Sequence, residues 1–580
     1  MKTCSSLVRT TVVAAVVVLL SSTTGMLAQQ KGKSTVSDER VAELMKMALE
    51  QAVQQAKPGA PAAPQGPVVD LQIEDAVNRA AEQNIDLSVA KLNPQLQDLS
   101  LAQTRAAYKP TLTGTFGDNS RTSIPSDTLS GGAITTTQNY TYNAGISQVL
   151  PWTGGTAAFN WNNGRQFLAS NNYRINPSYS SSFQLQLTQD LWRNFTIDAT
   201  RQSLWTGLIQ RQITDVNLRA TIVNTVASTR NAYWDLVYAI QALEVARQSL
   251  TLSEKLVQDN QARVEIGTLA PLDVITAQSQ AATARQTVVQ REQTVKQNEI
   301  TLKRLIVAST TDPLWSATLN PVDRPEPPAA AAPIDLESAI RNALDKRTDL
   351  IVSRETLRQS EITLKYNKNQ TAPRAQLVAN YGASGTGGDI WSRIDPTTGK
   401  PTNTGGVVTL AQAGGYTDAL RIMSQRQAPA WSAQVNFSYQ IGTSSQDAAY
   451  ARAKVQLQQS QMQLKKQELQ VATDVTNAAL NVQNYLQQVA TTRVARELAQ
   501  KKLEAEQSKF DVGMQTNYFV TQAQNDLLNA QTAELQAIAN YRKALVTFQQ
   551  VQETGSGSVS GVSSGGTGGT GGTGSTGGGA

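Results

Sequence analysis

The sequence contains no histidine and only one cysteine, so it lacks the side chains that most catalytic and metal sites use. The absence of histidine excludes histidine-based nucleophilic catalysis, most catalytic zinc sites and histidine pH switches. The single cysteine, Cys4, cannot form a disulfide within the chain. The sequence also shows no convergent carboxylate pair, nucleophile elbow or phosphate-binding loop. We therefore expect a protein that is not an enzyme and that uses no metal or other cofactor.

Charged and aromatic residues are scarce, at 17% and 6% of the 580 residues. The net charge of +6 comes from 51 basic and 45 acidic residues, which are spread along the chain without a dense Lys/Arg cluster. Nucleic-acid-binding proteins carry a clustered basic face, so we expect no nucleic-acid partner. Paired acids such as Glu504 and Glu506 stand among lysines, which is typical of a solvated helix face.

Long apolar runs are missing except near the N-terminus. Residues 1–28 contain Lys2 and Arg9, then the apolar run Val12–Leu20, then small residues up to Ala28. This order is typical of a signal peptide. The run is well short of the ~20 residues that a membrane-spanning helix needs. We therefore expect cleavage near Ala28 and export of the protein, with any membrane span made of β-strands.

The chain contains an internal repeat. Residues 73–77 resemble residues 336–340, which begin 263 positions further along the chain (336 minus 73). Residues 266–280 resemble residues 512–526 at an offset of 246 (512 minus 266). A period of about 250 residues is too long for a solenoid unit, which runs about 20–50 residues. The pattern therefore predicts a duplicated structural half.

The repeat and the composition divide the chain into six segments. The tail is almost wholly Gly, Ser and Thr, which predicts disorder because it cannot bury enough apolar surface. We predict a signal peptide (1–28), an N-terminal helix with a Pro/Ala-rich linker (29–69), a first repeat (70–308), a connector (309–333), a second repeat (334–552) and a disordered tail (553–580).

Four segments alternate apolar and polar residues, which predicts β-strands with one apolar face. The apolar positions are Tyr140, Tyr142, Ala144 and Ile146; Phe183, Leu185 and Leu187; Leu377, Ala379 and Tyr381; and Trp431, Ala433, Val435, Phe437, Tyr439 and Ile441. Runs of about 9–11 residues fit an outer-membrane barrel with lipid outside and water inside. A soluble β-sandwich would show the same alternation. The signal peptide and the adjoining helices favour the barrel.

Two segments predict very long helices. Residues 197–265 contain no proline, and residues 446–512 contain neither proline nor glycine. A helix of about 67 residues is ~100 Å long at 1.5 Å per residue. Apolar residues recur every seven positions, as in Val475, Val482 and Val489, which is typical of helices packed side by side. An ordinary two-stranded coiled coil is the alternative, and the strands and the duplication speak against it.

Each long helix is predicted to end at a glycine, Gly267 or Gly513, and a second helix of 35–40 residues should follow. Glycine supplies the left-handed backbone that closes a helix, and Pro271 suits the first turn of the next one. On these residues alone, each segment is an αα-hairpin turn.

Together with the strand entries, these turns resemble the TolC family of outer membrane efflux proteins. The resemblance covers about residues 70–552. It is carried by YKPTL (108–112), LQLTQ (185–189), IGTLAPLDV (266–274), TAPRAQL (371–377) and FDVG (510–513). It implies an α+β membrane protein with two tandem structural repeats per chain. Three protomers would share one outer-membrane β-barrel, continued by a long periplasmic α-helical (coiled-coil) barrel.

The resemblance also implies a function and partners. The homotrimer would be a passive conduit in a tripartite efflux or type I secretion system, embedded in outer-membrane lipid. Energy would come from an inner-membrane transporter of the RND or ABC type. The helical tips would dock on a periplasmic adaptor protein. The residues that match these tips are Ile266, Gly267, Thr268, Val512, Gly513 and Met514.

The sequence departs from the family pattern at the expected periplasmic gate. Gln515 stands where gated members carry arginine, and Phe519 and Gln522 stand where they carry aspartate. Asp273 remains, but its usual basic partner is missing. Asp526 is either a ring of charge one to two turns away or, as we favour, a solvated helix charge. Phe519 either forms an apolar iris or, as we favour, a buried contact between helices.

A second departure is an additional strand pair at about 139–166, where the usual family member has two long strands per half. This hairpin either widens the barrel or stands outside the cell. A different class of function also remains open at this stage. The chain could be a structural or adhesive surface protein, with a barrel anchor and a coiled coil but no through-channel.

Overall fold

The computed structural model describes residues 67–124, 134–168, 173–267, 269–324, 335–402 and 406–555. All the helices and strands named below belong to one compact unit that begins at Val68. The predicted signal peptide, the N-terminal helix, most of the linker and the tail from residue 556 lie outside the described residues, and so does Thr268.

Helices make up most of the described chain. They are α3 (Ile73–Gln83), α4 (Ile85–Ala90), α5 (Leu92–Ala106), α6 (Ala199–Glu265), α7 (Pro271–Ile306), α8 (Pro313–Ser316), α9 (Leu336–Lys346), α10 (Thr348–Gln370), α11 (Tyr416–Ser424), α12 (Ser445–Asp511) and α13 (Asn517–Glu553). The two long helices of 67 residues are confirmed, each within two residues of its predicted ends.

The long helices start at well-formed caps. The Asp198 side chain accepts a hydrogen bond from Arg201 N at the start of α6. Ser444 and Asp447 form a capping box at the start of α12. Such caps satisfy backbone N–H groups that have no partner within the helix. Because neither helix contains proline, its backbone hydrogen bonds continue without a break up to the glycine that follows its last turn.

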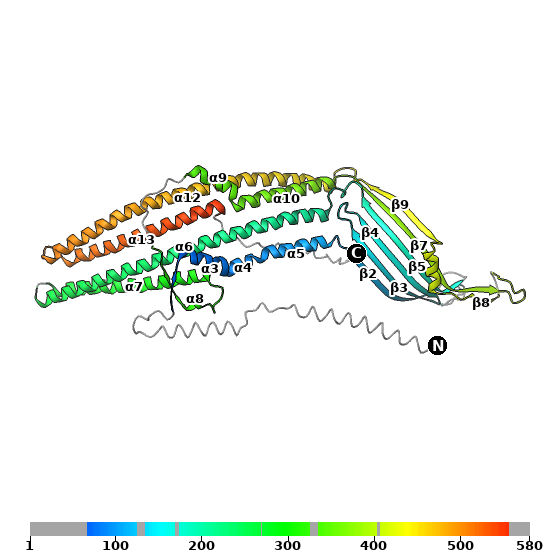
Figure 1. Cartoon of the computed structure of the whole chain (residues 1–580), viewed down its shortest axis with the longest axis horizontal. Helices are drawn as coiled ribbons and strands as arrows, with labels where there is room; N and C mark the ends of the chain where they lie inside the picture. The colour runs from blue at the N-terminus through cyan, green and yellow to red at the C-terminus, as the bar shows by residue number, and fades with distance from the viewer. Residues whose placement is uncertain are drawn as a thin grey trace, which may run out of the picture. The chain divides into compact units, whose positions relative to one another are not determined.

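The helices pack four abreast at two levels (Figure 1). Toward the turns that follow α6 and α12, the order of contacts is α7, α6, α13, α12. Toward the strands, the order is α5, α6, α10, α12. The heptad seam predicted in α12 is confirmed, since Val475, Val482 and Val489 are buried. None of the described helices combines the length and the apolar character that a bilayer crossing requires.

The strands form one large antiparallel sheet. They are β2 (Thr111–Ser123), β3 (Thr135–Val149), β4 (Thr156–Leu168), β5 (Ile175–Asp190), β7 (Arg374–Ile394), β8 (Val407–Gln412) and β9 (Pro429–Ser438). The order is β2-β3-β4-β5-β7, and both β8 and β9 pair with β7. The additional hairpin predicted at 139–166 is β3 and β4, which lie inside the sheet between β2 and β5. It therefore does not stand apart from the other strands.

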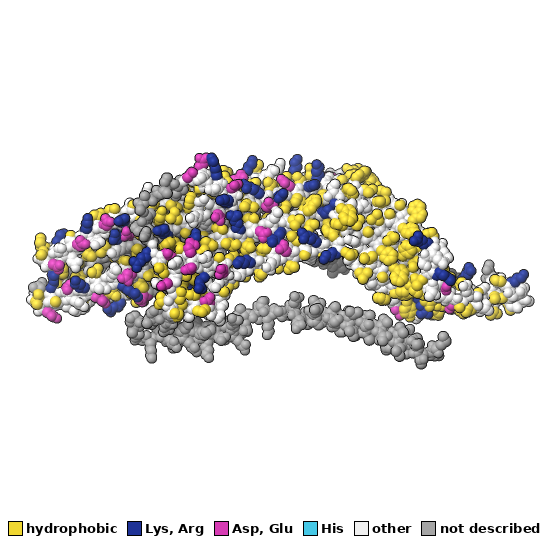
Figure 2. Space-filling view, in the orientation of Figure 1, with side chains coloured by type: hydrophobic (Ala, Val, Ile, Leu, Met, Phe, Trp, Pro, Cys, Tyr) yellow, Lys and Arg dark blue, Asp and Glu magenta, His cyan; other side chains and the backbone are white. Residues whose placement is uncertain are grey.

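One face of the sheet is apolar and exposed. Phe116 is 86% exposed, Trp431 79% and Phe437 63%. Figure 2 shows hydrophobic side chains gathered over the strands. A sandwich would cover such a face with a second sheet. The only other sheet among the described residues is the two-stranded pair β1 (Val68–Leu71) and β6 (Thr318–Pro321), so the predicted strands do not form a sandwich.

The alternation of apolar and polar residues continues beyond the end of the last strand. We predicted strand character up to Ile441, but β9 ends at Ser438. Ser438 pairs with Arg374, which is the first residue of β7, so Tyr439 has no strand residue opposite it. The chain then turns at Gly442, whose φ is +98°, and enters α12.

Two features near the middle of the helices were not predicted. The parallel pair β1–β6 and helix α8 lie partly in the segment that we assigned as a connector. They cover α6 around Tyr233, which is fully buried and whose hydroxyl lies 2.7 Å from Asp323 Oδ2 and 3.0 Å from Leu71 O. The same carboxylate oxygen accepts the Ile73 N–H at the start of α3, so this core joins the start of α3 and the segment after β6 to the middle of α6.

Arg347 joins four helices and should be important for stability. It is 1% exposed and contacts Asp349 Oδ1 at 3.0 Å and Asp474 Oδ2 at 2.8 Å. Removing one partner of such a buried pair leaves the other charges buried without a counter-charge. We expect Arg347→Ala to lower the free energy of unfolding by about 3 kcal/mol, measured by thermal denaturation followed by circular dichroism.

The matched control is Arg341→Ala in the neighbouring helix α9. Arg341 forms an ion pair with Glu337, and both side chains are 76% exposed. An exposed pair contributes at most about 1 kcal/mol. Equal midpoints for the two variants would contradict a structural role for Arg347.

Candidate functional site: the helical tips

The two long hairpins turn through the same kind of helix cap. After α12, Gly513 donates its N–H to Phe510 O at 3.1 Å, and Met514 donates to Lys509 O at 2.9 Å. These two bonds define a Schellman motif. After α6, Gly267 makes the equivalent first bond to Val264 O at 2.9 Å. The φ angles of Gly267 and Gly513 are +79° and +75°, a left-handed conformation that side chains other than glycine disfavour by ~1–2 kcal/mol.

The tips present apolar side chains to solvent. Ile266 is 74% exposed, Val512 70% and Met514 77%. Leu272 and Tyr518 are also exposed nearby along the chain. Exposed apolar groups clustered at one end of a protein mark an interaction site. The tips therefore have the surface chemistry of a docking site, and five of the six tip residues identified in the sequence lie in described positions.

The two tips are connected to each other. Asn517, at the start of α13, donates through Nδ2 to Asp273 O in the first turn of α7 at 3.2 Å. Arg263 donates to Phe510 O at 3.1 Å and to Asp511 Oδ1 at 2.9 Å. Its guanidinium also lies 4.5 Å from the centroid of the Phe510 ring. The two hairpins therefore end in one joined surface.

An apolar cluster supports this surface from within. It consists of Leu256, Leu503, Phe510, Val520, Ala523 and Leu527, contributed by α6, α12 and α13. Because Phe510 belongs to this cluster and also accepts from Arg263, the tip of α12 is held by both packing and hydrogen bonding. The backbone at the turn is thus positioned by side chains one to three turns away.

Three of the predicted gate residues lie along one face at the start of α13. Phe519, Gln522 and Asp526 are three or four residues apart, which places them on one side of the helix. Gln515 precedes α13, and Asp273 lies in the first turn of α7. Gln522 Nε2 donates to Asp526 Oδ1 at 3.0 Å. Gln515 Nε2 donates to Glu506 Oε2 at 2.7 Å, so this amide is held by α12 and does not point freely into solvent.

Asp526 and Phe519 differ in how they are held. Lys502 contacts Asp526 at 2.7 Å and lowers the pKa of that carboxyl, opposed in part by burial. Asp526 is therefore half of a partly exposed ion pair within one chain. Phe519 is 46% exposed and packs edge-on against Tyr518, with ring centroids 5.5 Å apart. The buried contact between helices that we favoured for Phe519 is not made within a single chain.

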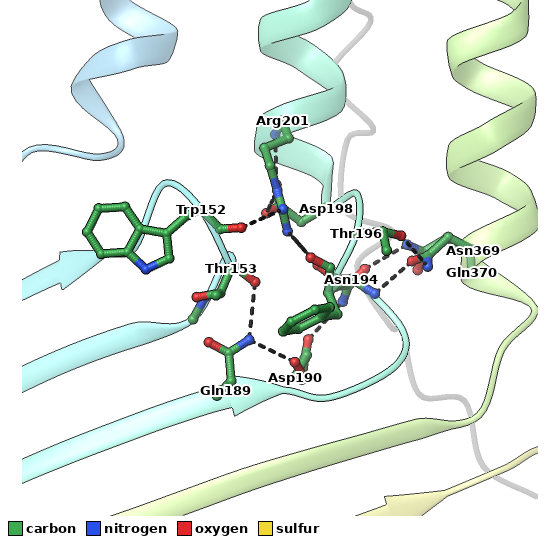
Figure 3. Close-up of polar contacts among 12 residues, drawn as sticks. Trp152, Thr153, Gln189, Asp190, Asn194, Thr196, Asp198, Arg201, Asn369 and Gln370 are labelled. Atoms are coloured by element: carbon green, nitrogen blue, oxygen red, sulfur yellow. Dashed lines mark hydrogen bonds and ion pairs between the residues drawn. The ribbon is translucent and has the colours of Figure 1, made fainter.

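A second cluster joins the sheet to the helices (Figure 3). Arg201, in the first turn of α6, is 8% exposed and pairs with Asp198 at 2.8 Å. Its guanidinium donates to Trp152 O at 3.1 Å, to Asn194 O at 2.7 Å and to Phe195 O at 2.9 Å. One arginine thus binds the turn between β3 and β4 and also the segment that leads from β5 into α6.

Amide side chains complete this joint (Figure 3). Gln189 Nε2 donates to Thr153 O at 3.1 Å, which binds the end of β5 to the β3–β4 turn. Gln370 Nε2 donates to Asn194 Oδ1 at 2.6 Å, which binds the end of α10 to the same corner. The sequence predicted a strand pair at about 139–166 but not the partners of its turn, because Gln189 and Arg201 lie about 40 residues further along the chain.

The family model of the outer membrane efflux proteins matches residues 76–307. No curated protein sequence matches the chain.

Several solved structures share the fold. The CmeC outer membrane channel of Campylobacter jejuni has a TM-score of 0.58 at 13% identity, covering 83% of this chain and 85% of that one. The outer membrane protein VceC of Vibrio cholerae has a TM-score of 0.56 at 13% identity, covering 83% and 96%. The open state of the Neisseria gonorrhoeae MtrE outer membrane channel has a TM-score of 0.53 at 16% identity, covering 83% and 89%.

The β3–β4 turn has no room for a side chain at Gly154. Its φ is +72°, and a Cβ added there would lie 2.3 Å from Asp198 Oδ2. We expect Gly154→Ala to destabilise the protein by at least about 2 kcal/mol, through strain and displacement of the Arg201–Asp198 pair. The temperature at which the purified protein loses its folded electrophoretic form measures this effect.

Gly114→Ala is the matched control for this substitution. A Cβ at Gly114, in β2, would meet no atom within 4 Å. We expect this variant to unfold within a degree or two of the wild type. A Gly154→Ala protein as stable as Gly114→Ala would show that the turn adapts and that the joint is not tightly packed.

Proposed function

We propose that the chain is an outer membrane efflux protein, as the match of residues 76–307 to that family model indicates, and that it forms the passive trimeric channel of a tripartite efflux or type I secretion system. It is an outer-membrane efflux component whose long helices extend into the periplasm. The observation that supports the channel most directly is the exposed apolar surface of two joined glycine turns at the far end of helices about 100 Å long. An inner-membrane transporter, of the RND or ABC type, supplies the energy.

The helical edges of the chain support assembly with further copies. On one side, α5 exposes Leu92, Leu96 and Leu99. On the other side, α12 exposes Val455, Met462 and Leu469, at 63%, 65% and 72% and seven residues apart. Heptad spacing of exposed apolar residues is typical of a helix that lacks its partner. The two edges are complementary but different, and such interfaces close into rings.

The strand edges lie on the same two sides of the chain. β2 follows α5, and β9 precedes α12, so each side carries one helix edge and one strand edge. A neighbouring copy that covers α12 with its α5 therefore also brings its β2 to β9. In the bilayer this pairing satisfies the backbone groups of both strands, which lipid cannot do. Three copies complete the ring, with the apolar face toward lipid and the polar face toward water.

The tips match a partner with six-fold symmetry. Each chain carries two similar turns, Ile266-Gly267 and Val512-Gly513-Met514, so a trimer presents six. We infer that the two turns belong to tandem structural repeats and that a periplasmic adaptor protein docks on this pseudo-six-fold surface. Apolar side chains at its centre would supply most of the binding energy, as at other protein interfaces.

Charges at both tips should abolish export without affecting insertion. We expect the double variant Ile266→Glu with Met514→Glu to reach the outer membrane as a trimer but to export less than a tenth of the wild-type amount. Gly513→Pro should act in the same way, because proline cannot adopt a φ near +75°. Efflux of a toxic compound from cells that lack their own channel provides the measurement.

Thr311→Glu is the control for the tip variants. It adds one glutamate in the exposed turn after α7, at the opposite end of that helix from the tip. We expect normal export from this variant. If the tip variants also export normally, the docking assignment is wrong, whereas loss in all variants would indicate a general folding defect.

Single-channel recording separates the conduit from a non-conducting structural or adhesive protein. We expect steady conductance steps from purified protein in planar bilayers. Phe519→Ser should increase the step size, because it replaces a half-exposed ring on the gate face of α13 with a small polar group. If neither protein conducts, the alternative of a barrel anchor without a channel is correct.

A further inference from the structure

We propose that three copies of this chain close a barrel of eighteen strands, in which the β3–β4 hairpin is part of the wall. This proposal rests on the trimer proposed above and concerns its width. The family pattern of two long strands per half would give twelve strands. Here each chain supplies six long strands, namely β2, β3, β4, β5, β7 and β9. The short strand β8 pairs only with the far end of β7, beyond the residues that β9 covers.

The hairpin is paired along its full length on both sides. β3 pairs with β2 from Thr135 to Ser147, and β4 pairs with β5 from Thr156 to Gln166. Strands of 13 and 15 residues exceed the 9–11 that a transmembrane strand needs. Removing the hairpin from the wall would break these two ladders, and β2 and β5 would then have to pair with each other to avoid open edges in lipid.

The hairpin also shares the two faces of its neighbours. Phe159 of β4 lies between Ile146 of β3 and Leu185 of β5 in the strand register. The rings of Phe159 and Phe183 are 6.5 Å apart, and Phe183 in turn packs against Tyr381 of β7. One apolar belt therefore runs across strands from both halves of the chain, as a continuous lipid-facing wall requires.

The periplasmic end of the hairpin is fastened to the helices. Arg201 and Gln189 hold the carbonyls of Trp152 and Thr153, and Gly154 has no space for a side chain beside Asp198 (Figure 3). A hairpin that stood outside the barrel would not need its turn hydrogen-bonded to the start of α6. This joint places the hairpin at the same level as the ends of β5 and β7.

The width of six strands also agrees with the width of the helical layer. Six strands spaced ~4.8 Å apart and tilted by ~40° span an arc of ~38 Å. Four strands span ~25 Å by the same relation. The four helices next to the sheet, α5, α6, α10 and α12, span ~36 Å at ~9 Å per helix. The sheet thus continues the helical wall without narrowing.

Closure of eighteen strands is also geometrically consistent. Because six antiparallel strands are contributed by each copy, β9 of one copy runs opposite to β2 of the next, and no parallel pair arises. The barrel backbone would then be ~36 Å across, compared with ~24 Å for twelve strands. The narrowest part of the path would lie at the helical tips and not within the membrane.

Disulfide cross-linking in isolated outer membranes tests the position of the hairpin. Cys4, the only cysteine, is replaced by serine. Thr111 pairs with Ser147 in the next strand, whereas Gln186 lies three strands from Thr111. We expect T111C with S147C to form a disulfide within the chain. T111C with Q186C should form none, because ~14 Å separates strands three apart and a disulfide needs Cα atoms within ~7 Å. The reverse result would overturn the proposal.

Closure between copies is tested by joining β2 to β9. T111C is combined in turn with S432C, Q434C and N436C, which share the polar face of the sheet with Thr111. We expect one of these pairs to give a covalently linked trimer. Electron cryomicroscopy of the purified protein then counts the strands. A trimer with twelve strands would overturn this proposal and leave the channel function standing, whereas the absence of any trimer would overturn both.

Discussion

The unpaired backbone of the two outermost strands is the constraint on which the assembly depends. A sheet with open edges cannot reside in a bilayer, because lipid offers no hydrogen bonds to N–H and C=O groups. In this chain the open edges are β2 and β9. They continue into helices α5 and α12, whose exposed apolar residues face the same two sides. One neighbouring copy can therefore satisfy both the polar requirement of the strands and the apolar requirement of the helices. In the proposed trimer, this coupling gives the exposed apolar surface of each chain a defined partner.

The long helices transmit this arrangement to the periplasmic end. Each runs for 67 residues because its sequence contains no proline and its first backbone N–H groups are capped. Each stops at a glycine that closes the last turn in a left-handed conformation. Between these ends, Arg347 and Tyr233 bury polar groups that fix how neighbouring helices meet. The position of the tips is consequently determined by the regular backbone of the two long helices and by a few buried polar contacts.

The sequence was informative wherever a local pattern determines the structure. The absence of helix breakers predicted α6 and α12, and the glycines predicted both tips. Alternation predicted β3, β5, β7 and β9, and the additional hairpin was predicted as a departure from the family pattern. The sequence was silent where the determining contact is distant. The four-residue pair β1–β6 joins segments 250 residues apart, and Arg201 recognises backbone carbonyls, which carry no residue identity. The end of β9 was also misplaced, because it depends on where its partner strand begins and not on the residues of β9 themselves. Of the proposed site, the tips were predictable, and the contacts that position them were not.

The role of the proposed gate residues becomes clearer if the part of the channel within the membrane is wide. If the barrel is no narrower than the helical wall, selection falls to the start of α13. There the proposed gate would be lined by the ring of Phe519 and by the amides of Gln522 and, just before α13, Gln515. Gln515 is bound to Glu506, and Asp526 is neutralised by Lys502. An ion ring attracts or excludes cargo by charge, and salt screens that effect. A ring of phenylalanines instead resists the entry of water itself, through its apolar surface. Passage through this gate would then depend more on cargo size and on opening by the docked adaptor than on cargo charge or ionic strength.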